Sequence, residues 1–217
     1  MTEAMHFETV NLQGPVLPAD LVVPDDAQGL VLFAHGSGSS RLSRRNRWVA
    51  EVLQRHGLAT LLFDLLSEEE AEDRRKVFQI SLLARRVGEA MDWVERRMDL
   101  QRLPLGLFGA STGAAAALLA AAQRPTRVAA VVSRGGRPDL AFQVLNQVLA
   151  PTLLIVGGRD TEVLALNRDA LRRLAGPKRL EVVPGASHLF EEAGTLESVA
   201  ALAVAWFERH LGGKSAD

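Results

Sequence analysis

The chain has 217 residues, of which 47% are hydrophobic and 24% charged, as is typical of one globular domain with a substantial core. Its formal net charge of −1 gives no electrostatic basis for binding nucleic acid. It has no cysteine, which excludes disulfides, thiolate metal sites and a cysteine nucleophile and is compatible with a reducing cytoplasm.

We expect one domain over residues 1–217, with an edge hairpin in 1–28 and a loose tail at 213–217. The N-terminus lacks the basic start and apolar run of a signal peptide. The longest apolar stretches, residues 114–122 and 199–207, are too short to span a bilayer. We therefore expect a cytoplasmic protein without a membrane partner.

The first predicted strands, residues 7–12 and 16–23, form the edge hairpin, because prolines within and between them suit only an edge. Residues 29–34 form an apolar strand that is buried on both faces. It leads into the glycine-rich segment 35–40, which is suited to presenting backbone N–H groups to an anion. A flexible loop or a phosphate-binding loop would also be rich in glycine, but the Lys-Ser/Thr pair of a P-loop is absent.

A helix is predicted over residues 46–56, followed by a buried strand over 59–63 that ends at Asp64. The helix dipole favours the acidic run 68–70 at a helix start, and we interpret this run as solvated surface rather than as the mouth of an active site. Apolar residues then recur every three or four positions, which predicts one amphipathic helix over about 71–99.

The strongest motif follows an apolar strand that begins at residue 105 and precedes an alanine-rich helix over 114–122. Residues 109–113, GASTG, have the pattern Gly-x-Ser-x-Gly. A tight strand-to-helix turn strains the serine backbone, and only residues without a Cβ fit two positions before and after it. Ser111 is therefore a candidate nucleophile, although a glycine-lined turn with an N-capping serine would have the same sequence.

Three more pairs of strand and helix complete the chain. Strands are predicted at 128–132, 152–156 and 180–183, and helices over about 139–149, over about 162–175 and from Thr195 as an N-cap. Strands that alternate with helices from residue 29 onward predict a mostly parallel sheet with helices on both faces. Sites in such sheets lie at the carboxyl ends of the strands, where this chain has residues 35–40, Ser111, Asp160 and His188.

A serine nucleophile needs a base, and the chain has five histidines. His188 is the preferred base because it follows the last strand. His35 belongs to the glycine-rich segment, where we expect its hydrogen bonds to hold the loop in shape. His6 lies in the predicted hairpin, and His56 and His210 lie at helix ends, where the helix dipole favours such groups.

The base in turn needs an acid that orients it. Asp160 is preferred, because it follows the strand before that of His188. Asp139 follows the preceding strand and remains an alternative, whereas Asp64 ends a strand too far from the predicted base loop. The order along the chain is then serine, aspartate and histidine.

With these loops in this order, the sequence resembles the α/β-hydrolase superfamily, and within it the small, lidless dienelactone-hydrolase-like group, over about residues 30–212. The motif around Ser111 resembles its nucleophile elbow, residues 35–38 its oxyanion loop, and the segments of Asp160 and His188 its acid and base loops. The resemblance implies an α/β-hydrolase fold without a large lid. Dienelactone hydrolases proper use a cysteine nucleophile, and this chain has none.

The resemblance implies that the backbone N–H groups of Ser37 and Thr112 bind the oxyanion. The expected reaction is that of a serine esterase with a catalytic triad. His188 takes the proton of Ser111, Ser111 attacks an ester carbonyl, and water releases the acyl group, while Asp160 orients His188. We expect no metal and no organic cofactor. An acyltransferase, or a catalytically silent binding domain on the same fold, would share these sequence features.

The expected partner is a small ester or lactone, bound by a monomer or homodimer. The short connection between residues 132 and 152 leaves no room for an inserted lid, which favours an open, shallow pocket and small soluble substrates. Arg41, Arg134 and Arg137 follow strand ends near the expected pocket mouth, where they could pair with a substrate carboxylate. Ordinary surface arginines would occupy the same positions.

Overall fold

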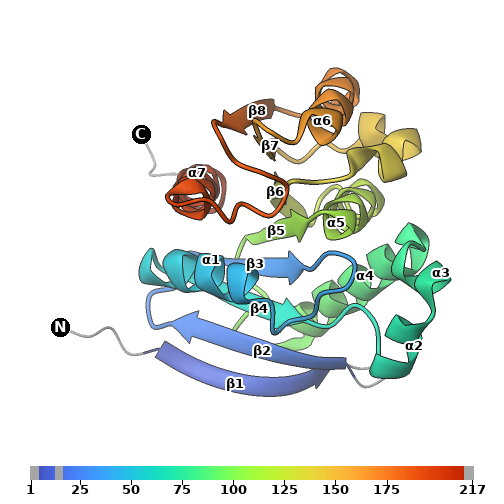
Figure 1. Ribbon diagram of the computed structural model, residues 1–217. Coiled ribbons are helices and arrows are strands. Elements are labelled where there is room, and N and C mark those ends of the chain that lie inside the picture. Colours follow the sequence, from blue (N-terminus) through green and yellow to red (C-terminus); the bar gives the residue numbers. More distant parts are fainter. Residues whose placement is uncertain (1–4, 13–16, 213–217) are drawn as a thin grey trace.

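The computed structural model describes residues 5–12 and 17–212, so the predicted tail at 213–217 and the turn of the first hairpin lie outside it. The described strands are β1 (Met5–Leu12), β2 (Leu17–Pro24), β3 (Gly29–Ala34), β4 (Leu58–Phe63), β5 (Leu105–Ala110), β6 (Val128–Arg134), β7 (Thr152–Gly157) and β8 (Lys178–Val183). They form one sheet in the order β1-β2-β4-β3-β5-β6-β7-β8 (Figure 1). The strands from β4 to β8 in this order are parallel, and β1 and β2 are antiparallel to their neighbours, which confirms the predicted mostly parallel sheet.

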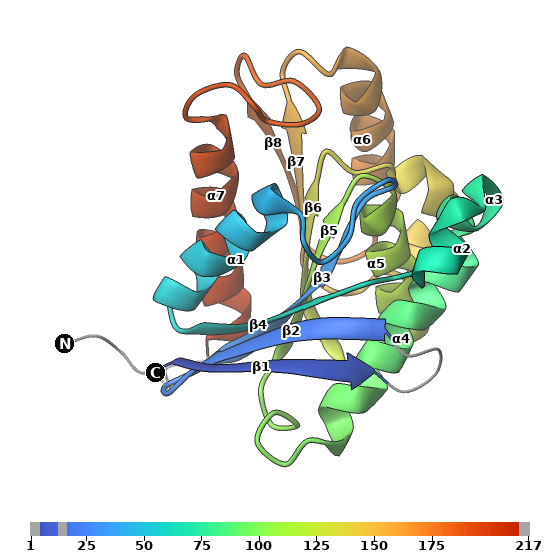
Figure 2. The same cartoon turned by 60° about the horizontal axis from the view of Figure 1, so that its bottom comes forward.

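Helices cover both faces of the sheet (Figures 1 and 2). They are α1 (Arg44–Arg55), α2 (Glu68–Glu72), α3 (Arg74–Val77), α4 (Ile80–Arg96), α5 (Thr112–Gln123), the 3-10 helix η1 (Pro138–Gln147), α6 (Thr161–Arg173) and α7 (Thr195–Leu211). On one face α1 packs against α7. On the other face α4, α5, η1 and α6 form a continuous row. Within the described residues, no helix has the length and the apolar character needed to cross a membrane.

The sheet divides the core into two parts, because successive side chains of a strand point to opposite faces. Leu32 and Leu107 pack on the side of α5, while Phe33 and Phe108 stack on the side of α1 and α7 with ring centroids 4.8 Å apart. The alanine-rich α5 is buried along most of its length. Its small side chains let it lie close to the sheet, which fixes the position of its N-terminus next to Ser111.

The predicted helix over 71–99 is wrong in one respect, because three helices, α2, α3 and α4, occupy residues 68–96. Asp73 separates α2 from α3, because its backbone is extended at φ −85° and ψ 104°. Its carboxylate accepts a hydrogen bond from the Arg75 N–H in the first turn of α3. The apolar stripe begins only at Val77, and the charged segment before it has no apolar period that could show where one helix ends and the next begins. The acidic run does begin a helix, with a capping box between Ser67 and Glu70.

The first hairpin is confirmed, but only β1 is an edge strand, since β2 lies between β1 and β4. The prediction placed both strands at an edge because of their prolines. Pro18 is tolerated because the ladder between β2 and β4 begins one residue later, at Ala19 opposite Phe63. The Pro18 carbonyl accepts a hydrogen bond from the Asp64 N–H at 3.2 Å. Pro18 therefore bonds to the chain after β4 as an acceptor, and it lacks only the backbone N–H that other residues of a strand have.

Two helix predictions differ from the structure in detail. The segment after β6 is a 3-10 helix with a kink at Ala141, rather than the α-helix expected over 139–149. The N-cap of α7 is Gly194 in the left-handed conformation, and Thr195 is the first helical residue. The Thr195 hydroxyl donates to the Glu192 carbonyl at 2.6 Å, so it caps the preceding turn instead of the helix.

Candidate active site

Ser111 lies in the turn between β5 and α5, and its backbone is strained, with φ 51° and ψ −120°. A side chain with a Cβ is unfavourable at this φ and persists there only when its surroundings hold it. The Ser111 N–H donates to the Arg134 carbonyl at 3.2 Å. The Ser111 carbonyl accepts from the N–H groups of Ala114 and Arg137, each at 3.1 Å. These three hydrogen bonds hold the serine in its strained conformation at the end of the strand.

Glycines on either side of Ser111 allow the turn to be this tight. A Cβ on Gly113 would overlap the carbonyl oxygens of Ala34 and His35, at the end of β3. A Cβ on Gly109 would overlap the backbone of Ala114. The sequence motif is thus explained by contact between backbones, and this contact brings the start of α5 against the glycine-rich loop that follows β3.

His188 and Asp160 meet beyond the ends of β7 and β8. The His188 Nδ1 lies 2.6 Å from the Asp160 Oδ2, and the aspartate side chain is the more buried of the two, at 14% exposure against 38%. A carboxylate accepts hydrogen bonds only, so Nδ1 carries the proton and donates. In the neutral ring, Nε2 is then an unprotonated acceptor.

Ser111 and His188 line the same small cavity, of about 180 Å³. The structure therefore brings Ser111, His188 and Asp160 to one place at the carboxyl edge of the sheet. Arg45 and Asn46, at the start of α1, also line this cavity. Sequence reasoning missed both, because nothing in a helical pattern shows which residue near its start faces a site.

The alternative acid, Asp139, is engaged elsewhere. Its two carboxylate oxygens accept hydrogen bonds from Arg137 Nε at 2.8 Å and Nη2 at 2.7 Å. This bidentate pair occupies the carboxylate, whereas Asp160 directs its own to an imidazole. The contacts therefore favour Asp160 as the partner of the histidine base.

The resemblance implies the backbone N–H groups of Ser37 and Thr112 as oxyanion donors; Ser37 lines the Ser111 cavity, and Thr112 directly follows Ser111 in the chain. Ser37 lies in the glycine-rich loop, and Thr112 is the first residue of α5, where helical N–H groups have no partner within the helix. Within residues 5–12 and 17–212, neither N–H donates to a backbone carbonyl. Both are therefore available to a ligand oxygen, and the N-terminal end of α5 favours negative charge there.

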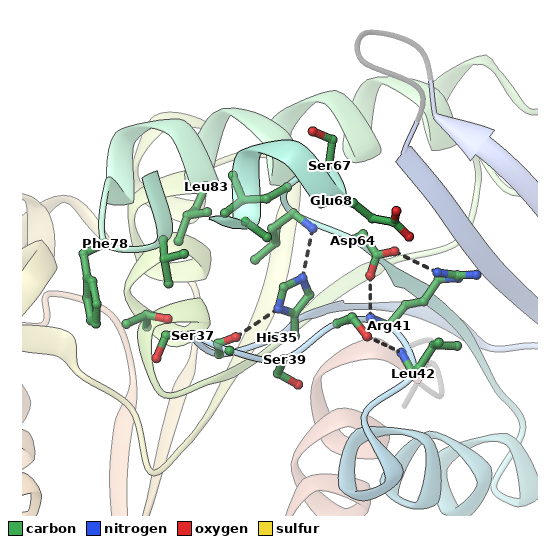
Figure 3. Close-up of a pocket in the computed structure, with 18 of the residues that line it drawn as sticks. His35, Ser37, Ser39, Arg41, Leu42, Asp64, Ser67, Glu68, Phe78 and Leu83 are labelled. Carbon is green, nitrogen blue, oxygen red and sulfur yellow. Dashed lines mark hydrogen bonds and ion pairs between the residues drawn. The ribbon is translucent and has the colours of Figure 1, made fainter. Parts of the chain in front are cut away.

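His35 holds the glycine-rich loop to the loop after β4 (Figure 3). Its Nδ1 lies 3.0 Å from the Gly36 carbonyl, and its Nε2 lies 3.0 Å from the Leu65 N–H. The carbonyl accepts and the amide donates, so Nδ1 carries the proton and Nε2 does not. Burial lowers the pKa of His35, against smaller opposing effects of the Gly36 carbonyl and Asp64. A neutral histidine thus shapes the loop, as predicted.

Because burial lowers the pKa of His35, we expect the free energy of unfolding to depend on pH. The pKa of His35 is lowered from 6.5 in the folded chain, so the unfolded chain binds this proton first as the pH falls. We expect the free energy of unfolding to fall from about pH 6.5 downward, until the lowered pKa is reached. Urea unfolding between pH 8 and pH 5 should show a smaller loss in His35→Asn than in the unmodified protein.

His210 is the matched control for this measurement, because burial also lowers its pKa and it lies far from the loop, on α7. His210→Asn should keep the part of the pH dependence that His35 causes. Equal pH slopes in His35→Asn and the unmodified protein would contradict the assignment.

Figure 3 shows the lining of a larger cavity, of about 820 Å³. It adjoins the first cavity and shares Gly36, Ser37 and Ser39 with it. Much of its wall is apolar, with side chains from the loops after β3 and β4 and from α3 and α4: Leu42, Leu65, Leu66, Val77, Phe78 and Leu83. The sequence predicted a shallow pocket for small substrates. The observed volume is that of a site for a drug-sized group, and residues of α2 and α3 form part of the wall.

The three arginines predicted near the pocket mouth differ in their surroundings. Arg41 donates to Asp64 from its backbone N–H at 2.6 Å and from Nη1 at 2.8 Å, and Arg137 pairs with Asp139. Their role as substrate anchors stays a prediction, and each already has a carboxylate partner. Arg134 has no such partner within the described part of the chain, and it lines the smaller cavity.

Comparison with known proteins places this geometry in a family. Residues 27–201 match the model of a family described as an alpha/beta hydrolase domain. The chain belongs to this alpha/beta hydrolase family. The crystal structure of dienelactone hydrolase from Anabaena variabilis is 56% identical, with a TM-score of 0.92, over 97% of this chain and 100% of that one. The predicted superfamily, the dienelactone-hydrolase-like resemblance and the fold are thereby confirmed.

A more distant protein and a longer one are also similar to this alpha/beta hydrolase. Est1E from Butyrivibrio proteoclasticus shares the fold at 16% identity, with a TM-score of 0.79, over 94% of this chain and 98% of that one. A Mycobacterium tuberculosis protein provisionally named phosphoribosyl transferase is 59% identical over 201 residues, which are 92% of this chain and 45% of that protein. The chain thus spans less than half of this relative, whose name describes the longer protein. The family and the Anabaena variabilis structure support a hydrolase.

Proposed function

We propose that the chain is a serine hydrolase that cleaves carboxylic esters or lactones, with Ser111 as nucleophile, His188 as base and Asp160 as orienting acid. The observation that carries the proposal is the meeting of a strained serine and a histidine–aspartate pair at one cavity. A strained turn aims the hydroxyl, and the pair supplies a base in the correct tautomer. Membership of the family and the similarity to the Anabaena variabilis dienelactone hydrolase support it.

The reaction proceeds in two acyl transfers. His188 Nε2 takes the proton of Ser111 as Oγ attacks the carbonyl carbon, and the Ser37 and Thr112 N–H groups bind the resulting oxyanion. The intermediate collapses when the carbon–oxygen bond to the leaving group breaks and His188 gives its proton to that oxygen. Water, activated by His188, then attacks the acyl-enzyme and releases the acid. Throughout, Asp160 holds Nδ1–H and stabilises the charged imidazolium.

The two cavities divide the substrate between them. The oxyanion loop lies between the cavities, and Ser37 lines both of them. A substrate whose carbonyl carbon lies at Ser111 therefore has one side in the smaller, polar cavity and the other toward the larger cavity with its apolar side chains. The apolar walls favour a bulky hydrophobic group there.

A fluorophosphonate probe tests this function directly, because it phosphonylates an activated serine. We expect one equivalent of label on the peptide that contains Ser111 and none on peptides with Ser37, Ser39 or Ser133. A panel of p-nitrophenyl esters and lactones of graded size should be hydrolysed, with a preference for acyl or alcohol groups that fill the larger cavity. Label on another serine, or no turnover of any ester or lactone, would overturn the proposal.

A further inference from the structure

Arg134 is a buried arginine without a counter-ion among residues 5–12 and 17–212. It is the last residue of β6, and the residue is 8% exposed. Its Nη2 donates to the Asn46 Oδ1 at 3.3 Å, which is a bond to a neutral amide. Its Nε and Nη1 are buried and have no hydrogen-bond partner in the described chain. A buried guanidinium normally has a carboxylate or several acceptors, because leaving it unpaired in a medium of low dielectric constant is costly.

The surroundings of Arg134 add positive charge rather than compensate it. Burial, and to a smaller extent the charge of Arg45, lower the pKa of Arg134 to about 10, so the guanidinium remains charged at neutral pH. Asn46 lies in the first turn of α1, whose N-terminal end carries a partial positive charge. The Nη1 of Arg45 pairs with Glu191 at 3.1 Å, but its Nε is buried and has no hydrogen-bond partner in the part of the chain that the structure describes.

The smaller cavity is lined by Arg134, Asn46 and Arg45 together with Ser111 and His188. Three serines, Ser37, Ser39 and Ser43, also line this cavity. Its wall therefore combines two guanidinium groups, an amide and hydroxyl donors with the proposed nucleophile. Such a set of donors matches an anion with several oxygen atoms, and the planar fork of arginine pairs with carboxylate or phosphate through two parallel hydrogen bonds.

We propose that Arg134, Asn46 and Arg45 form an anion subsite of the Ser111 cavity, and that the substrate is an ester or lactone with a carboxylate or phosphate group on the side that lies there. The proposal rests on the function proposed for this cavity. It explains why the chain keeps an uncompensated charge in its interior, since the bound anion supplies the missing partner. It also fixes the orientation of the substrate, with its anionic group in the smaller cavity and an apolar group in the larger one.

Thermal unfolding with added anions tests the subsite without any turnover. Inorganic phosphate and succinate, in separate titrations, should raise the Tm of the unmodified protein, and the anion with the larger shift at equal concentration identifies the preferred oxygen group. The shift should be lost in Arg134→Gln and partly kept in Arg134→Lys. Arg127→Gln is the matched control, because the buried Nη2 of Arg127 has no hydrogen-bond partner among the described residues, while its Nε pairs with Glu95 and the residue lines neither cavity.

Kinetics test the link to the substrate. A p-nitrophenyl hemisuccinate should be hydrolysed with a higher kcat/KM than its methyl-capped neutral analogue, and Arg134→Gln should reduce this preference about tenfold or more, mainly through KM. Arg127→Gln should keep it. An absent Tm shift, or equal shifts in Arg134→Gln and the unmodified protein, would overturn the subsite. If no ester is hydrolysed but the Tm shift depends on Arg134, the subsite stands and the proposed hydrolase function fails.

If Arg134→Gln does not fold, Asn46→Ala and Arg45→Gln replace it in both assays. Each removes one donor of the cavity wall and leaves the guanidinium of Arg134 in place. Each should weaken the anion-dependent Tm shift, and unchanged shifts in both variants would contradict the proposed subsite.

Discussion

Ser111→Ala is expected to lower kcat by about three orders of magnitude or more, while the protein remains folded. The substitution removes the attacking oxygen, and what remains is the contribution of the oxyanion donors and of substrate binding. The fold should tolerate alanine, because the strained backbone is held by main-chain bonds to Ala114, Arg134 and Arg137 that the variant keeps. The measurement is steady-state hydrolysis of a p-nitrophenyl ester, with circular dichroism and Tm as tests of folding.

Ser133→Ala is the control for this experiment. Ser133 is fully buried near the end of the neighbouring strand β6, and it lines neither of the two cavities. Its hydroxyl has no hydrogen-bond partner within the described residues, so its removal should change kcat little. Comparable activity of Ser111→Ala and Ser133→Ala would show that the nucleophile has been assigned to the wrong residue.

The parts of the structure that follow from local rules could be predicted from the sequence. The turn at Ser111 was predicted because the clash of a Cβ at Gly109 or Gly113 is a property of the turn itself. The parallel sheet followed from alternating strands and helices, and the convergence of Asp160 and His188 followed from their places after strand ends. Each of these inferences needs only the order of elements and the geometry of one turn.

The parts that depend on packing could not be predicted. Arg134 and Ser133 are neighbours in the sequence, but the strand directs Ser133 toward α5 and Arg134 toward Asn46 on α1. A shift of one residue in the strand would exchange the two, and no sequence pattern shows which of them lines the smaller cavity. Likewise, α2 and α3 both line the larger cavity, but the break between them at Asp73 depends on a local cap within a charged segment that has no apolar period.

Asp160→Asn is expected to lower kcat by about four orders of magnitude, with little change in Tm. The Asp160 carboxylate accepts the Nδ1–H of His188 at 2.6 Å and so keeps Nε2 free of a proton. An asparagine can turn its NH₂ group toward Nδ1, which stabilises the opposite tautomer, and Nε2 then cannot take the proton of Ser111. The effect should appear in kcat, measured with the same p-nitrophenyl ester, while KM changes little.

Asp139→Asn is the matched variant, because Asp139 is the other aspartate at a neighbouring strand end and the change in charge is the same. Its carboxylate pairs with Arg137, whose side chain is 36% exposed, and such a partly solvated ion pair contributes about 1 kcal/mol or less. We therefore expect Asp139→Asn to keep kcat within about tenfold of the unmodified protein. A larger loss of kcat in Asp139→Asn than in Asp160→Asn would mean that the acid lies on η1 after β6, and that the 2.6 Å contact of His188 has no part in the reaction.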